Sequence, residues 1–151
     1  MKDQILDQYA RMWPREVFHR LAEKKKGLPK GHKSGPKQMY KEILLLTKPG
    51  VYVLYRDTEP YYVGQAKKLR LRLYEHACRA DSRYYNFWNF FSAFVVEDSE
   101  ARNEIEGILI ASMPTANSMR PRIKKESLPP PVKKMIREIE WRRANPRTAR
   151  E

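Results

Sequence analysis

The sequence predicts an α+β fold built on a small antiparallel sheet. Up to Pro49 the apolar residues recur at helical spacing, whereas residues 51–55 and 61–64 are short β-rich runs separated by a turn. Two such runs joined by a turn are typical of a hairpin. Beyond them the helical period returns, so we expect helices packed on the sheet.

Three further elements complete this predicted core. Residues 66–79 have helical spacing, and residues 90–96 are apolar enough to form a central third strand. Asp98 is a good N-cap for a helix over residues 100–112, which Pro114 ends. The order strand, strand, helix, strand, helix gives a three-stranded antiparallel sheet flanked by helices.

The flanking segments predict additional helices. Apolar spacing indicates N-terminal helices over residues 5–12, 15–26 and 37–47, with a basic loop rich in glycine and proline at residues 27–36. Near the C-terminus, residues 132–143 predict a highly charged helix.

At 151 residues the chain is long enough for one domain with extensions. We expect a helical N-terminal extension with a basic loop at residues 1–48, a core at residues 49–118, and a basic, proline-rich segment with a charged helix at residues 119–151.

The charge balance favours a polyanionic partner. The chain has 31 Lys and Arg against 18 Asp and Glu, a formal net charge of +13. Nucleic acid is the first candidate, although charge alone indicates no reaction. The single cysteine, Cys78, excludes an intramolecular disulfide and favours a reducing, cytoplasmic location, with association with the nucleoid left open. The sequence lacks an apolar run of the roughly 20 residues needed to span a membrane, so no membrane partner is expected.

One ordered set of residues carries the catalytic hypothesis. Two tripeptides, an arginine and histidine one helical turn apart, a glutamate and an asparagine follow one another in the core: Gly50-Val51-Tyr52, Tyr62-Val63-Gly64, Arg72, His76, Glu106 and Asn117. Taken singly, each is more typical of packing or of a solvated face. In this order and spacing the set resembles the GIY-YIG endonuclease superfamily, with valine in place of isoleucine in both tripeptides.

This resemblance implies a ββαβα core and a phosphodiester hydrolase. It implies catalytic roles for Tyr52, Tyr62, Arg72, His76, Glu106 and Asn117, with Gly50 and Gly64 as motif glycines. Glu106 would be the metal ligand, with Glu104 as a weaker alternative, and Asn117 would hold strand and helix ends together.

The chemistry of these side chains agrees with such a reaction. Glu106 is a hard oxygen ligand suited to a single Mg²⁺ or Mn²⁺ ion. Arg72 has a planar fork that matches phosphate oxygens. Tyr52 would deprotonate or orient the attacking water, which requires nearby cations to lower its pKa. Tyr62 would position the phosphate or water, and His76 would exchange protons or bind phosphate.

The sequence therefore predicts a metal-dependent DNA endonuclease, related to either restriction or repair and recombination. The alternative is a non-catalytic nucleic-acid-binding module that retains the fold. DNA, duplex or branched, is the expected partner, without a small-molecule cofactor, and a homodimer is left open. Phosphate contacts are expected from a set of basic residues: Lys30, Lys33, Lys67, Lys68, Arg70 and Arg79.

Overall fold

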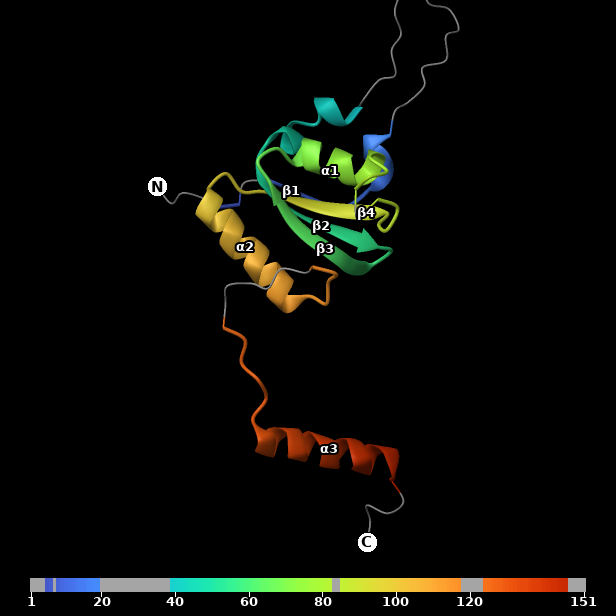
Figure 1. Cartoon of the computed structure of the whole chain (residues 1–151), viewed down its shortest axis with the longest axis vertical. Coiled ribbons are helices and arrows are strands. Elements are labelled where there is room, and N and C mark those ends of the chain that lie inside the picture. Colours follow the sequence, from blue (N-terminus) through green and yellow to red (C-terminus); the bar gives the residue numbers. More distant parts are fainter. Residues whose placement is uncertain (1–4, 7, 20–38, 83–84, 118–123, 147–151) are drawn as a thin grey trace, which may run out of the picture.

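The protein contains a four-stranded antiparallel sheet with helices on both sides (Figure 1). The computed structural model describes residues 5–6, 8–19, 39–82, 85–117 and 124–146. Strand order is β1-β4-β2-β3, with bounds β1 Tyr9–Pro14, β2 Gly50–Arg56, β3 Glu59–Ala66 and β4 Phe90–Val95. The predicted α+β class is confirmed, with four strands in place of three. Within the described residues, β3 forms an edge of this sheet.

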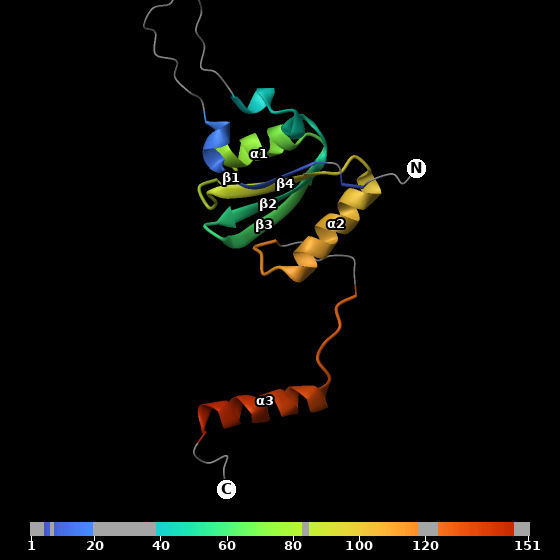
Figure 2. The same ribbon diagram turned by 180° about the vertical axis from the view of Figure 1, so that it is seen from behind.

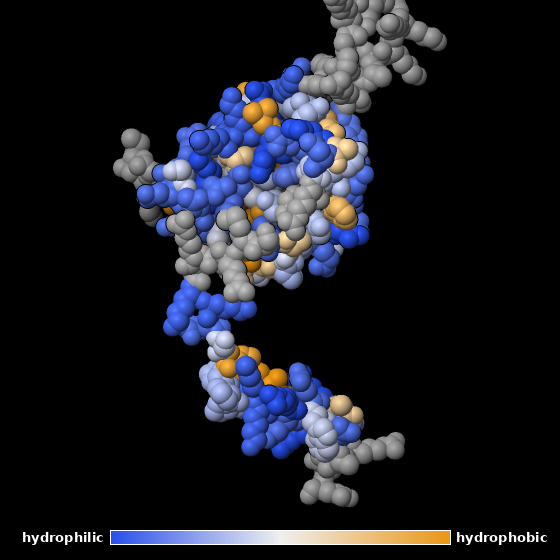
Figure 3. All heavy atoms as spheres, viewed as in Figure 1, coloured by the Kyte–Doolittle hydropathy of each residue, from blue (hydrophilic) through white to orange (hydrophobic). Residues whose placement is uncertain are grey.

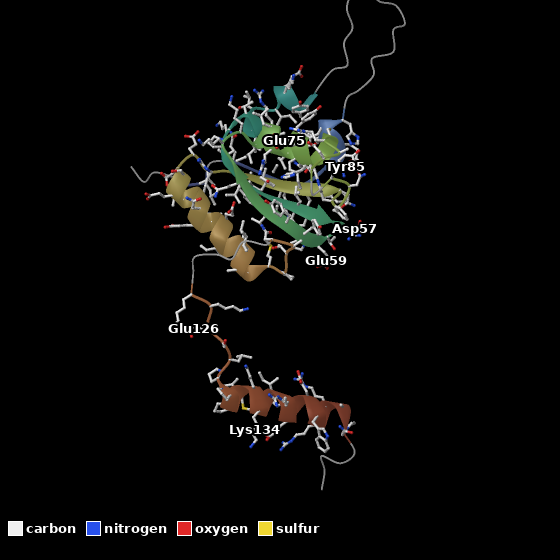
Figure 4. All side chains as sticks on the ribbon, viewed as in Figure 1. Asp57, Glu59, Glu75, Tyr85, Glu126 and Lys134 are labelled. Atoms are coloured by element: carbon white, nitrogen blue, oxygen red, sulfur yellow. The ribbon has the colours of Figure 1, made fainter. Side chains whose placement is uncertain are left out.

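The β2–β3 hairpin turns at Asp57, whose φ of 55° is in the left-handed region. Asn89, the residue before β4, fixes this turn. Its side chain accepts from the Asp57 backbone N–H at 2.7 Å and donates to the Asp57 carboxylate at 2.9 Å. Figure 4 shows Asp57 and Glu59 together at this end of the hairpin. The hairpin register, which aligns the two tripeptide motifs, is therefore supported from outside the hairpin.

Two helices cover opposite faces of the sheet, as Figures 1 and 2 both show. Helix α1 is Leu69–Cys78 and helix α2 is Ser99–Ser112. Asp98 caps α2 as predicted, since its carboxylate accepts from the Ala101 backbone N–H at 2.8 Å. The two helices create two apolar cores, one on each face.

Alternation along β2 divides its side chains between these cores. Tyr52 and Leu54 face α1, in a cluster whose other buried members are Phe18, Tyr40, Leu46, Leu69, Leu73, Ala77, Trp88, Phe91 and Ala93. Val51 and Val53 face α2, in a cluster with Val63 and Val96. Because β2 is buried on both faces, its side chains are held in fixed positions.

The helix predicted for residues 5–12 is wrong, because residues 9–12 belong to β1, which pairs with β4. Tyr9 pairs with Phe94 and Trp13 with Phe91, and a register shift separates Ala10 from Trp13. Met12 lies at this irregularity with a φ of 52°, and its backbone N–H donates to Ser92 Oγ at 3.1 Å. The bulge interrupts the alternation of a strand, so the apolar residues have a helical spacing.

The helix predicted for residues 37–47 is also wrong. Two short 3₁₀ segments, Met39–Glu42 and Leu44–Thr47, take its place, with Ile43 extended between them. Each segment buries one large side chain, Tyr40 in the first and Leu46 in the second. A continuous helix would not bury both. Of the helix predicted for residues 15–26, Arg15–Phe18 is a 3₁₀ turn. Residues 20–38, including the basic loop, lie outside the described residues.

The predicted C-terminal helix is confirmed as α3, Pro130–Ala144. It lies apart from the sheet in Figures 1 and 2. Across the residues that the structure describes, no helix is long and apolar enough to cross a bilayer.

Candidate active site

Tyr52 and His76 form a buried hydrogen bond on the α1 face of the sheet. The Tyr52 hydroxyl oxygen lies 2.8 Å from Nε2 of His76. Strand β2 directs Tyr52 toward α1, and His76 lies in the last turns of that helix. The side chains are 0% and 5% exposed, so water competes little for this bond.

Gly64 provides the space that the Tyr52 phenol occupies. It is the cross-strand partner of Tyr52 in the β2–β3 ladder. A Cβ atom added at Gly64 would come within 2.5 Å of Tyr52 Cζ. A side chain at this position would therefore displace the phenol. This contact gives a physical reason for the glycine in the second tripeptide.

The second nitrogen of His76 is held by the loop that follows α1. Its Nδ1 lies 3.1 Å from Ser82 Oγ, and its backbone carbonyl accepts from Trp88 Nε1 at 3.3 Å. Burial, and then the nearby charge of Arg72, lower the pKa of His76 to about 4. The imidazole is therefore neutral at pH 7, with one nitrogen able to accept a proton.

Arg15 ties the same loop to the end of α1. Its guanidinium donates to the Ala77 carbonyl at 2.6 Å, to the Trp88 carbonyl at 3.2 Å and to Asn86 Oδ1 at 3.2 Å. It also lies over the rings of Tyr85 and Trp88. Figure 4 shows Tyr85 beside the end of α1. The N-terminal segment thus stabilises the loop that carries Ser82.

Tyr52 is a weaker acid here than in water. Burial, and then the nearby Tyr62, raise its pKa above the ordinary value of a phenol, while Arg72 partly opposes this through its charge and a hydrogen bond. Arg72 therefore lowers the pKa of Tyr52 as expected of a nearby cation, but the net shift is upward. Desolvation outweighs the one cation that acts on the phenol.

Tyr62 and Arg72 complete this side of the site. The Tyr62 ring lies edge-on to His76 at a centroid distance of 5.8 Å and 6.2 Å from the Tyr52 ring. Arg72 Nη1 lies 3.3 Å from a carboxylate oxygen of Glu75, which Figure 4 shows on α1. Partial burial lowers the pKa of Arg72, but Tyr52 and Glu75 outweigh it and raise the pKa overall. Because its side chain remains half-exposed, Arg72 can also reach an anion from solvent.

Glu106 approaches the site from α2. Partial burial raises the pKa of its carboxyl group, while a hydrogen bond from Gln65 opposes this. No ion pair involves Glu106 within the described part of the chain, and the charge of Glu106 acts on Tyr52. A half-buried carboxylate without a cation nearby gains stability from a bound cation. In the ranges that the structure describes, no group of three or more His, Cys, Asp or Glu could hold a metal together. Glu106 is the carboxylate at this site that could hold a cation.

Comparison with known proteins agrees with this geometry. Residues 48–112 match the family model of the GIY-YIG catalytic domain. These residues form a GIY-YIG domain.

Similar solved structures include the GIY-YIG N-terminal endonuclease domain of UvrC from Thermotoga maritima. A point mutant of that domain, bound to its catalytic divalent cation, is 24% identical, with a TM-score of 0.45, and the match covers 53% of this chain and 92% of that chain. The magnesium-bound domain is 26% identical, with a TM-score of 0.41, covering 47% of this chain and 83% of that chain. No curated protein matches the sequence.

Asn117 follows the matched residues of the GIY-YIG domain and pairs with the edge of its sheet. Its side chain accepts from the Val63 backbone N–H at 3.0 Å and donates to the Val63 carbonyl at 2.7 Å. The Ala116 backbone N–H donates to the Tyr61 carbonyl at 2.7 Å. Asn117 therefore joins the segment after α2 to β3 through hydrogen bonds to the Val63 backbone.

The GIY-YIG domain brings Tyr52, Tyr62, Arg72, His76 and Glu106 together from four elements. Of the predicted phosphate contacts, Lys67, Lys68 and Arg79 are exposed, and Arg70 is half-buried. Arg79 forms a bidentate pair with Asp81, at 2.9 Å and 3.2 Å, which competes with phosphate. Lys30 and Lys33 lie outside the described residues.

Two side chains at the site were missed by sequence reasoning. Ser82 lies in a loop whose spacing from His76 has no characteristic pattern. Gln65 follows the second tripeptide directly, so strand alternation places it on the α2 face beside Glu106. Of the two, only Gln65 could have been found from the sequence, through strand alternation.

Proposed function

We propose that this protein is a divalent-metal-dependent DNA endonuclease that cleaves phosphodiester bonds at the GIY-YIG domain. One observation carries the proposal: the Tyr52 hydroxyl, bonded to a neutral His76, lies within electrostatic reach of both Arg72 and Glu106. We infer that these groups serve as a proton acceptor, an anion-binding cation and a metal-ligating carboxylate. Phosphodiester hydrolysis requires these three functions.

The metal would be a single Mg²⁺ or Mn²⁺ held by Glu106. The half-buried carboxylate fits such an ion, because a cation restores the charged form that burial disfavours. When bound, the ion supplies charge stabilisation at the phosphate. Gln65, whose side-chain N–H donates to Asn103 Oδ1 at 2.7 Å, also lowers the pKa of Glu106 and so favours its charged, metal-binding form.

Tyr52 and His76 would together accept the proton of the attacking water. We assign His76 the tautomer in which Nδ1–H donates to Ser82 Oγ and Nε2 accepts from the Tyr52 hydroxyl, because it satisfies both contacts. The water proton then passes to the Tyr52 oxygen while the Tyr52 hydroxyl proton passes to Nε2. This coupled transfer avoids a free phenolate, which the raised pKa of Tyr52 disfavours.

Arg72 would bind the phosphate that is attacked. Its half-exposed guanidinium has donors that remain available beside its contacts to Glu75 and Tyr52. A planar fork directed at phosphate oxygens stabilises the extra negative charge of the transition state.

The proposal is tested by incubating a labelled DNA duplex with the protein in Mg²⁺, in Mn²⁺ and in EDTA. We expect cleavage with either metal and none in EDTA. The Glu106→Asp variant, which shortens the ligand, should require a higher Mg²⁺ concentration for half-maximal cleavage. Duplex binding without cleavage under all three conditions would instead support a binding module that retains the fold.

A further inference from the structure

Helix α3 has two opposite faces of different chemistry. At 100° per residue, Lys134, Arg137 and Trp141 fall on one face. Val132, Met135, Ile136 and Ile139 form an apolar stripe on the other. Figure 3 shows the visible side of α3 as mostly hydrophilic, with a small hydrophobic patch. We call the side with Lys134, Arg137 and Trp141 the cationic face.

Lys134 and Arg137 have no acidic partner in the part of the chain that the structure describes. Residues 130–144 contain five Lys and Arg but only two Glu. Among the described residues, no ion pair or side-chain hydrogen bond involves Lys134 or Arg137, although Glu138 is adjacent in sequence. Figure 4 shows Lys134 on α3, away from the sheet. These cations are therefore available to an anionic partner.

An exposed tryptophan lies among these cations. Trp141 is 56% exposed and lines a shallow hollow with Lys134, Arg137, Glu138 and Arg142. An aromatic ring between cations is typical of nucleic-acid contacts, where the ring packs on sugar or base and the cations bind phosphate. A membrane-surface helix instead places its aromatic residues on the apolar face, opposite its cations. The position of Trp141 favours nucleic acid.

We propose that the cationic face of α3 binds the DNA phosphate backbone away from the cleaved bond, as a second contact of the same protein. This inference rests on the proposed function for the identity of the polyanion. Twelve residues separate Asn117 from Pro130, and such a chain reaches at most about 40 Å when extended. That span is about one turn of duplex, so one DNA molecule can contact both the GIY-YIG domain and α3.

The test measures binding of a 40-base-pair duplex to the full-length protein in EDTA, by fluorescence anisotropy over a series of salt concentrations. Loss of two phosphate contacts in a Lys134→Gln/Arg137→Gln variant should weaken binding about tenfold and reduce the slope of log K against log salt by about 2. The matched control is Met135→Ala/Ile139→Ala, on the apolar stripe, which should leave both quantities unchanged. Equal affinity and slope in the cationic-face variant and the parent would overturn the proposal.

Two other binding partners of α3 would give different results in these experiments. A second copy of the chain predicts that the apolar-stripe variant loses both dimerisation, seen by sedimentation, and duplex affinity. A membrane predicts that anionic phospholipid vesicles, but not duplex, bind the parent through the cationic face. Either result would overturn the proposal. Failure of the proposed function is distinguishable, because it would appear as intact, α3-dependent duplex binding without cleavage in Mg²⁺.

Discussion

The Tyr52 hydroxyl lies 2.8 Å from His76 Nε2, and both side chains are buried between β2 and α1. A Tyr52→Phe substitution removes the hydroxyl and leaves the ring. We expect single-turnover cleavage to fall by about 10²- to 10⁴-fold, the range for losing a positioned proton-transfer group. Duplex affinity in EDTA should stay within about twofold. A cleavage rate unchanged in Tyr52→Phe would remove Tyr52 from the mechanism.

His76 should make stability depend on pH. Its pKa is lowered to about 4 in the folded protein, while an unfolded histidine titrates near 6.5. Between these values the unfolded chain binds more protons, so the free energy of unfolding falls as pH decreases from about 6.5 to 4. We expect this loss to be about 2 kcal/mol after allowance for solvent screening. Denaturant unfolding at several pH values measures it.

The control for this pH dependence is His76→Gln, which retains a polar side chain without a titratable ring. Its stability should lack the component between pH 6.5 and 4. If the parent and His76→Gln lose stability in parallel over that window, His76 is not the titrating group.

Gly64→Ala should disturb the site through a steric effect alone. The added methyl group overlaps the Tyr52 phenol, which is packed on all sides and cannot move without cost. We expect destabilisation by about 1–3 kcal/mol, together with a large loss of cleavage. Thermal unfolding and the cleavage assay measure the two effects. A Gly64→Ala protein with parental stability and activity would contradict the close packing of Tyr52 against β3.

Ser82 should act through the tautomer of His76. Ser82→Ala removes the oxygen 3.1 Å from Nδ1, so the proton-accepting state of Nε2 is no longer favoured. We expect about a tenfold slower cleavage step, with unchanged duplex affinity. Ser82→Thr keeps the hydroxyl and should restore the rate. Equal rates for Ser82→Ala and Ser82→Thr would show that the hydroxyl plays no part.

Asn117→Ala should weaken the edge of the sheet. The substitution removes both hydrogen bonds to Val63 and leaves the backbone of β3 partly unsatisfied. We expect a loss of about 1–3 kcal/mol in the free energy of unfolding. Hydrogen exchange should accelerate at the Val63 amide, whereas the Leu54 amide on β2 should be less affected. Unaltered protection at Val63 would show that the two bonds contribute nothing.

The sequence was most informative where short-range patterns set the local structure. The β2–β3 hairpin, the capped helix α2 and the charged helix α3 follow from short-range patterns, and the structure confirms them. β1 could not be predicted, because the bulge at Met12 breaks its alternation and its pairing with β4 spans about eighty residues. Long-range pairing of this kind leaves little trace in local spacing.

The same distinction applies to the candidate site. Tyr52, Tyr62, Arg72 and His76 were identified through the family resemblance that their order and spacing carry. The sign of the Tyr52 pKa shift was not, because burial sets it and burial depends on the whole fold. Ser82 contacts His76 from a loop, and Arg15 stabilises that loop from the N-terminal segment, so only three-dimensional contacts reveal them.

The central claim is that Arg72 and Glu106 belong to one hydrolytic site, and nicking of supercoiled plasmid DNA in Mg²⁺ tests it most directly. We expect the parent to nick and both Arg72→Ala and Glu106→Ala to lose about 10²-fold or more of the initial rate. The exposed residues Arg56 and Glu104 provide charge-matched controls, and Arg56→Ala and Glu104→Ala should nick at about the parental rate. All four variants should melt within a few degrees of the parent. Undiminished nicking by Arg72→Ala and Glu106→Ala would contradict the assignment of this site.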